Sequence, residues 1–100
     1  MLEVILRPIV ELQLDRIADY TKAEWGETQA KRYLEDIRRQ IVFASEFPGI
    51  GSTAFGLPAQ YRKIRSGAHR VIYRCTGTHL IVVRIVHERE DVPDAWGDLE

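Results

Sequence analysis

Three strand-like runs in the C-terminal half are separated by very short turns, and this spacing constrains the fold more than any other feature. The runs are YRKIRS (61–66), HRVIYRC (69–75) and HLIVVRIVH (79–87). The turns at SGA (66–68) and TGT (76–78) are each short enough for a β-hairpin. The sequence therefore predicts an antiparallel three-stranded meander.

Two helices are predicted upstream of the meander. After Pro8, a suitable first helical residue, apolar positions follow helical spacing up to Gly26, which breaks the helix. A second, cleaner stripe ends before Pro48 and consists of Ala30, Tyr33, Leu34, Ile37, Ile41 and Ala44. The one-turn break predicts an antiparallel helical hairpin. Residues 48–58 are rich in Gly, Pro, Ser and Thr and are predicted to be loop.

The apolar run 2–7 before Pro8 is predicted to be a further strand that joins the meander. The expected fold is thus α+β, in the order β-α-α-β-β-β, with the helical hairpin packed on one face of an antiparallel sheet. Strict alternation along the strands predicts that Ile81, Val83 and Ile85 face the helices. It places three cations together on the open face of the sheet: Arg70, Arg74 and Arg84.

Charge is sorted along the chain into three blocks. Residues 1–60, 61–89 and 90–100 carry formal charges of −2, +6 and −5, which together give the net charge of −1. A solvated sheet face would mix signs, because like charges opposite one another on neighbouring strands are destabilising. The basic block therefore indicates a partner that supplies negative charge, either nucleic-acid phosphate or an acidic protein segment.

One hundred residues form one domain, spanning 1–100, with an acidic tail over 90–100 whose order the sequence leaves open. No apolar run is long enough to cross a membrane, and the N-terminal segment lacks the pattern of a signal peptide. The lone Cys75 fits a reducing, cytoplasmic setting and is interpreted as a small core residue. Tyr20 and Trp25 are likewise expected to pack in the core or within the helical hairpin.

The charged end of the last strand, HERED (87–91), has the composition of a catalytic set but not its spacing. Adjacent strand residues point to opposite faces, so His87 and Glu88 cannot address one substrate atom together. No metal-ligand spacing, phosphate-binding loop or nucleophile elbow is present, and no cofactor is expected. Trp96 lies in the acidic tail, where a core role is not obvious, and is a candidate interface anchor.

Four segments together resemble the ParE branch of the RelE/ParE toxins, the toxin halves of bacterial type II toxin–antitoxin pairs. They are YTKAEWGETQAKRYLEDI (20–37), FPGIG (47–51), YRKIRSGAHRVIYR (61–74) and VVRIVHERED (82–91), within a resemblance that covers roughly residues 4–92. The resemblance implies the β-α-α-β-β-β fold and a toxin that binds and inhibits DNA gyrase. It also implies a ParD-like antitoxin, which contacts operator DNA itself and wraps the toxin with an acidic C-terminal segment. Contact of the toxin with DNA would then be indirect.

The RelE branch, a ribosome-dependent and metal-independent mRNA endonuclease, is the alternative that the resemblance leaves open. Its basic catalytic positions are matched by Lys63, Arg65, Arg70 and Arg89, but the Tyr it needs beyond Arg89 is missing from EDVPDAW. Glu90 also departs from ParE sequences, which often carry an apolar residue there. A toxin that retains only antitoxin binding is a third possibility. The residues expected to bind antitoxin or target are Arg62, Arg65, Arg70, Arg74, Arg84, Arg89 and Trp96.

Overall fold

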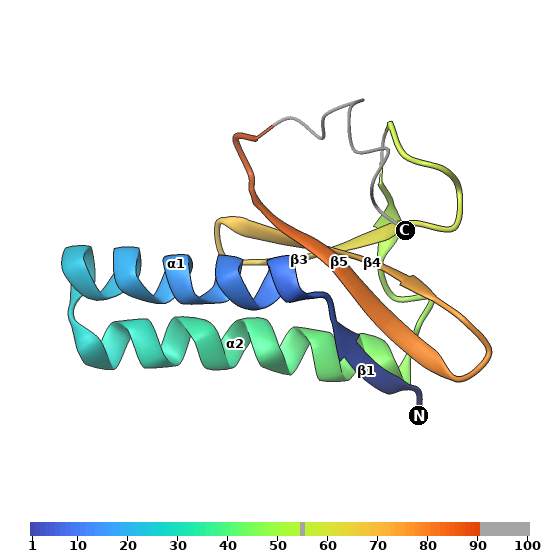
Figure 1. The fold of residues 1–100 in the computed structure, drawn as a ribbon, viewed down its shortest axis with the longest axis horizontal. Coiled ribbons are helices and arrows are strands. Elements are labelled where there is room, and N and C mark those ends of the chain that lie inside the picture. The colour runs from blue at the N-terminus through green and yellow to red at the C-terminus, as the bar shows by residue number, and fades with distance from the viewer. Residues whose placement is uncertain (55, 91–100) are drawn as a thin grey trace.

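The structure, a computed structural model that describes residues 1–54 and 56–90, places two antiparallel helices against a mixed sheet (Figure 1). The helices are α1 (Pro8–Trp25) and α2 (Glu27–Glu46). The strands are β1 (Glu3–Leu6), β2 (Ser52–Thr53), β3 (Arg62–Ser66), β4 (His69–Cys75) and β5 (His79–His87). The predicted α+β class and the helical hairpin are confirmed. The two-residue strand β2 lies in the segment that was predicted to be loop.

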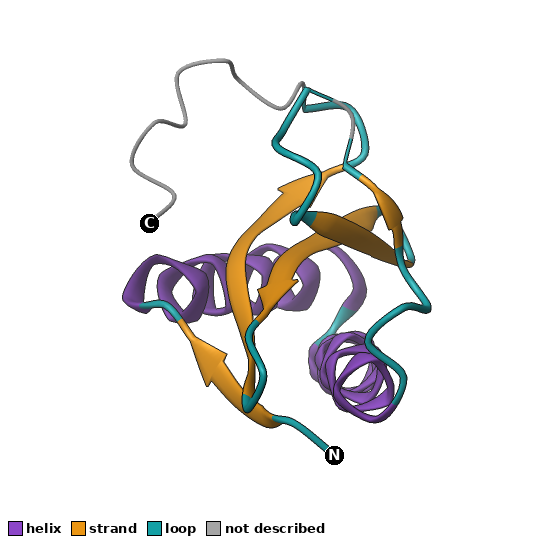
Figure 2. Cartoon of the chain, turned by 90° about the vertical axis from the view of Figure 1, so that its right-hand side faces the viewer, coloured by secondary structure: helices purple, strands orange, loops and turns teal. Residues whose placement is uncertain are grey.

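The strand order is β1-β5-β4-β3-β2, so the first strand lies beside the last (Figure 2). Strand β1 runs parallel to β5, with Glu3 opposite His79 and Leu6 opposite Val82. The β3–β4 and β4–β5 pairs are antiparallel, as the short turns predicted, and β2 also pairs antiparallel with β3. The sheet is therefore mixed, and the prediction of a wholly antiparallel sheet is wrong for β1. Beyond the end of β1 the side chain of Gln13 on α1 continues the pairing, because its Oε1 accepts the Ile85 N–H at 2.8 Å. A backbone donor at the end of the ladder is thereby satisfied.

Gly26 makes the sharp reversal between the helices. Its φ of +93° is accessible to glycine at little cost but strained for other residues. Its N–H donates to the Lys22 carbonyl at the end of α1, and its carbonyl accepts from the Ala30 N–H at the start of α2. One residue therefore caps both helices and sets the hairpin.

The main core lies between the helices and the sheet. Both helical stripes contribute to it, through Val10 and Leu14 on α1 and Ile37, Ile41 and Ala44 on α2. Cys75 packs against this core but is only partly buried. No helix in the described ranges combines the length and apolarity that a membrane span requires.

Strict alternation along the last strand is wrong, because a β-bulge interrupts it. Ile72 lies opposite Arg84 whereas the next residue, Tyr73, lies opposite Val82, so Val83 is the additional residue. As a result Leu80, Val82 and Ile85 face the helices, and not the predicted set of Ile81, Val83 and Ile85. The far face of the sheet holds a second apolar cluster, which the loop before β3 covers in part. Its members are Ala54, Tyr61, Ile72, Val83 and Val86.

Candidate binding surfaces

Five cations lie on the sheet face that points away from the helices. Arg70 lies opposite Val86, Arg84 opposite Ile72, and Arg74 opposite Ile81. These three apolar partners belong to the second cluster or pack against it, and directly opposed side chains share a face. The expected grouping of three arginines is thus present. Strand β3 extends it, and the term basic face denotes the resulting set: Lys63, Arg65, Arg70, Arg74 and Arg84.

Like charges are opposed directly on this face. Arg65 and Arg70 are cross-strand partners, an arrangement that costs stability in isolation. Arg65 is offset by Glu88, whose carboxylate lies 3.2 Å from its guanidinium. Both side chains of that pair are substantially exposed, so the pair contributes only about 0–1 kcal/mol. The Arg65–Glu88 pair therefore offsets only a small part of the positive charge that the five side chains bring to this face.

Two of the predicted binding arginines lie elsewhere. Arg62 is opposite Tyr73, on the helix-facing side of the sheet. Its Nε donates to the Gly51 carbonyl at 3.0 Å and its Nη2 to the Gly49 carbonyl at 3.2 Å, so Arg62 fixes the loop after α2. Arg89 lies in the turn after β5, at the same end of the sheet as the β3–β4 turn. Trp96 falls outside the described residues.

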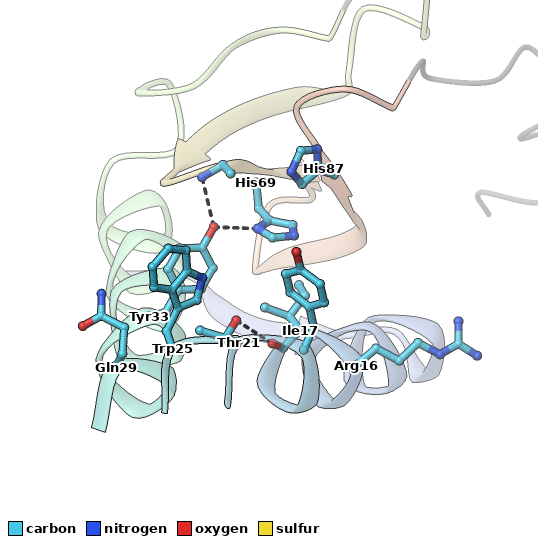
Figure 3. Close-up of a pocket in the computed structure, with 10 residues that line it drawn as sticks. Arg16, Ile17, Thr21, Trp25, Gln29, Tyr33, His69 and His87 are labelled. Atoms are coloured by element: carbon cyan, nitrogen blue, oxygen red, sulfur yellow. Dashed lines mark hydrogen bonds between the residues drawn. The ribbon is translucent and has the colours of Figure 1, made fainter. Parts of the chain in front are cut away.

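A pocket of about 550 Å³ lies on the opposite side, where the helical hairpin extends beneath the β3–β4 turn (Figure 3). The sequence did not predict this pocket, partly because two of the aromatic residues that line it were expected to be packed. Tyr20 and Trp25 were expected to be packed, but they are 66% and 71% exposed. They line the pocket together with Tyr33, Ala68, His69 and His87.

A hydrogen-bonded chain links α2 to β4 in this pocket. The Ala68 N–H donates to Tyr33 Oη at 3.0 Å, and Tyr33 Oη lies 2.6 Å from His69 Nδ1 (Figure 3). His69 Nδ1 at 2.6 Å is a much closer acceptor for the phenolic hydrogen than the Ser66 carbonyl at 3.4 Å, which favours the tautomer of neutral His69 that carries its hydrogen on Nε2. Burial and the neighbouring His87 lower the pKa of His69, although Glu90 and Glu88 oppose the shift. Burial raises the pKa of the Tyr33 phenol.

His87 and Glu88 point to opposite faces, as strand geometry predicted. The His87 and His69 rings are in edge-to-face contact inside the pocket, with 5.3 Å between their centroids. Glu88 instead pairs with Arg65 at the basic face. His87 Nδ1 accepts the Arg89 N–H at 3.1 Å, which assigns the hydrogen of neutral His87 to Nε2. Among residues 1–54 and 56–90, no group of three His, Cys, Asp or Glu side chains is arranged to hold a metal ion.

Comparison with known proteins identifies the family. The family model described as the ParE toxin of the type II toxin–antitoxin system parDE matches residues 4–92. Toxin ParE1 of Mycobacterium tuberculosis is 38% identical over 89 residues, covering 88% of this chain and 91% of the relative. Toxin ParE1 of Caulobacter vibrioides is 36% identical over 75 residues, covering 75% of this chain and 77% of the relative.

A solved structure titled as the chromosomal ParDE TA system from P. aeruginosa shares the fold. Its TM-score is 0.75 at 18% identity, with 87% of this chain and 96% of that chain covered. The fold, the order of the four sequence segments and the matched relatives agree with one another. The chain therefore belongs to the ParE toxin family of type II toxin–antitoxin systems.

Proposed function

We propose that this toxin acts by binding DNA gyrase, without chemistry of its own, and that a ParD-like antitoxin neutralises it by laying an acidic segment on the basic face. The observation that carries the proposal is the basic face itself. Five cations on three strands give this surface a charge complementary to an acidic chain, and the direct opposition of Arg65 and Arg70 would be relieved by an external counter-charge. Because gyrase and its DNA are cytoplasmic, the proposal also places the toxin there.

The position of the two pocket histidines supports binding over catalysis. General acid–base catalysis needs a titratable group within hydrogen-bond reach of the reacting atoms. His69 and His87 line the pocket on the helix side, whereas Arg70 projects from the other side of the sheet. The two imidazoles are therefore separated from the cations of the basic face by the sheet, and the carboxylate at that face, Glu88, is paired with Arg65.

One observation favours the alternative nuclease. Lys63, Arg65 and Arg70 do lie together on the basic face, at positions that RelE-type toxins use for mRNA cleavage. Three clustered cations can bind RNA phosphate and stabilise the charge that develops during cleavage. RelE-type toxins are expected to use a Tyr beyond Arg89 for proton transfer, and this chain has no Tyr there. Trp96 cannot replace it, because an indole N–H only donates a hydrogen bond.

Two assays on the same purified protein separate these functions. A gyrase supercoiling assay is expected to show inhibition, or trapping of gyrase-cleaved DNA, that is relieved by adding the antitoxin in advance. Unimpaired supercoiling at a large molar excess of toxin contradicts gyrase as the target. Primer extension on translated mRNA is expected to show no new cut sites, and reproducible cuts that disappear in the Lys63→Ala variant would establish the nuclease instead.

A further inference from the structure

The pocket beneath the β3–β4 turn has the features of a binding site for an apolar group. Its volume of about 550 Å³ falls within the range of about 300–1,000 Å³ that is usual for ligand sites. Tyr20 and Trp25 expose most of their surface beside it, and exposed aromatic residues are the usual anchors of interfaces. Tyr33, buried further in, is held in place by its hydrogen bonds to Ala68 and His69.

The polar groups in the pocket favour a hydrogen-bond acceptor. Both histidines use Nδ1 to accept hydrogen bonds, from Tyr33 and from the Arg89 N–H, so each neutral ring has its Nε2–H as the remaining donor. None of the described residues that line the pocket is a carboxylate. The cation in the lining is Arg16, whose side chain extends from α1 away from the histidines (Figure 3). An occupant that combines an apolar group with a carboxylate fits this environment.

The pocket and the basic face meet at one edge of the molecule. His69 and Arg70 are consecutive residues of β4, and they face the pocket and the basic face respectively. His87 and Glu88 divide in the same way at the end of β5. A single extended segment that passes around the β3–β4 turn can therefore contact both surfaces.

We propose that the pocket receives an apolar side chain from the antitoxin's acidic segment, and that a carboxylate beside that side chain accepts hydrogen bonds from His69 and His87. This inference rests on the proposed function, because it takes the antitoxin as the partner. It assigns the segment two contacts of different kinds, an apolar anchor in the pocket and acidic residues on the basic face. Hydrogen bonds to a charged acceptor contribute more than neutral ones, so the carboxylate adds selectivity to the apolar contact.

Binding of such a group is coupled to protonation of His69. The groups around this imidazole are Tyr33 on α2, His87 on β5, and Glu88 and Glu90 beyond β5. A bound carboxylate favours the imidazolium, so affinity rises as the pH falls and protons are taken up on binding. The site tolerates this charge, since Tyr33 Oη can accept from protonated Nδ1 and donate instead to the Ser66 carbonyl, 3.4 Å away.

A pair of matched probes tests the pocket directly. Isothermal titration calorimetry compares 2-naphthoate with 2-naphthylmethanol, which has the same ring system but no charge. At pH 6 we expect the naphthoate to bind about tenfold more tightly, the size of one charge-assisted hydrogen bond. The preference should shrink at pH 8 and disappear in H69Q/H87Q. The variant H79Q removes the histidine outside the pocket and should retain the preference.

Several results would overturn the inference. They are the absence of saturable binding by either probe, equal affinity for both probes at pH 6, and a preference that H69Q/H87Q leaves unchanged. Binding of 2-naphthylmethanol to H69Q/H87Q shows that the variant keeps its pocket, and the pH dependence of the wild type tests the same point without a substitution. Dissociation of a toxin dimer by the probe would identify a second copy as the occupant instead.

The antitoxin assay separates this inference from the proposed function. The toxin–antitoxin complex is expected to exclude 2-naphthoate, and H69Q/H87Q should weaken antitoxin binding about tenfold while H79Q does not. An antitoxin that binds the wild type and H69Q/H87Q equally, or that leaves the probe bound, defeats the inference and leaves the proposed function intact. An antitoxin that does not bind the wild-type toxin defeats the proposed function itself.

Discussion

Tyr73→Phe isolates the contribution of one buried hydroxyl to the packing of the loop after α2. Tyr73 is fully buried, and its hydroxyl donates to the Pro48 carbonyl at 2.9 Å and accepts the Gly51 N–H at 3.1 Å. Phenylalanine fills the same space but removes both hydrogen bonds. An unsatisfied buried donor or acceptor costs about 1–3 kcal/mol. Because the Pro48 carbonyl is only partly buried, we expect a total loss of about 2 kcal/mol.

Urea unfolding followed by far-ultraviolet circular dichroism measures this loss. In a thermal unfolding experiment on a domain of about 100 residues, the same loss of about 2 kcal/mol corresponds to a decrease in Tm of roughly 8–16 °C. Tyr20→Phe is the matched control, since its hydroxyl is on a side chain that is 66% exposed, and its effect should stay within about 0.5 kcal/mol. A loss below 0.5 kcal/mol for Tyr73→Phe would refute the assignment of these two hydrogen bonds as stabilising contacts.

Three further predictions concern the pocket and the core. Gly67→Ala should destabilise the fold by more than 1 kcal/mol in urea unfolding, because Gly67 has a φ of +57° and an added Cβ would lie 2.6 Å from the Tyr33 ring; an unchanged midpoint contradicts the close contact. Because the pKa of His69 is lowered in the folded state, the unfolded state binds more protons near that pKa, so stability should fall as the pH decreases below about 6.5. His69→Asn should flatten that decline, and an equal slope in both proteins excludes His69 as its source. Burial raises the pKa of the Cys75 thiol, so at pH 8 Ellman's reagent should react more slowly with the native protein than with protein unfolded in urea, and equal rates contradict this shielding.

Local signals predicted the helical hairpin and the meander, because their causes lie within a few residues. Gly26 and Pro48 bound the second helix in the sequence, and α2 does run from Glu27 to Glu46. The short turns likewise fixed the antiparallel pairing of β3, β4 and β5. The parallel pairing of β1 with β5 depends on a contact between the two ends of the chain, for which periodicity provides no signal.

The pocket could not be predicted because it depends on long-range geometry. Tyr33 and His69 are separated by 36 positions and meet only after the β3–β4 turn folds over the hairpin. The bulge at Val83 also reverses the alternation within one strand, and a single sequence does not reveal it. An apolar residue on a regular helical stripe was expected to be buried, yet Trp25 lies at the exposed end of α1, where the sheet does not cover it.

If the basic face is a docking surface for an acidic partner segment, reversal of its charges must weaken the binding of that partner. The most direct measurement is the affinity of the antitoxin as a function of salt concentration, for the wild type and for Arg70→Glu combined with Arg74→Glu. Arg32→Glu combined with Arg38→Glu, which reverses the same number of charges on exposed positions of α2, is the control. We expect weaker binding and a flatter salt dependence for the basic-face variant alone. Unchanged affinity and slope, or an equal effect in the control, would contradict it.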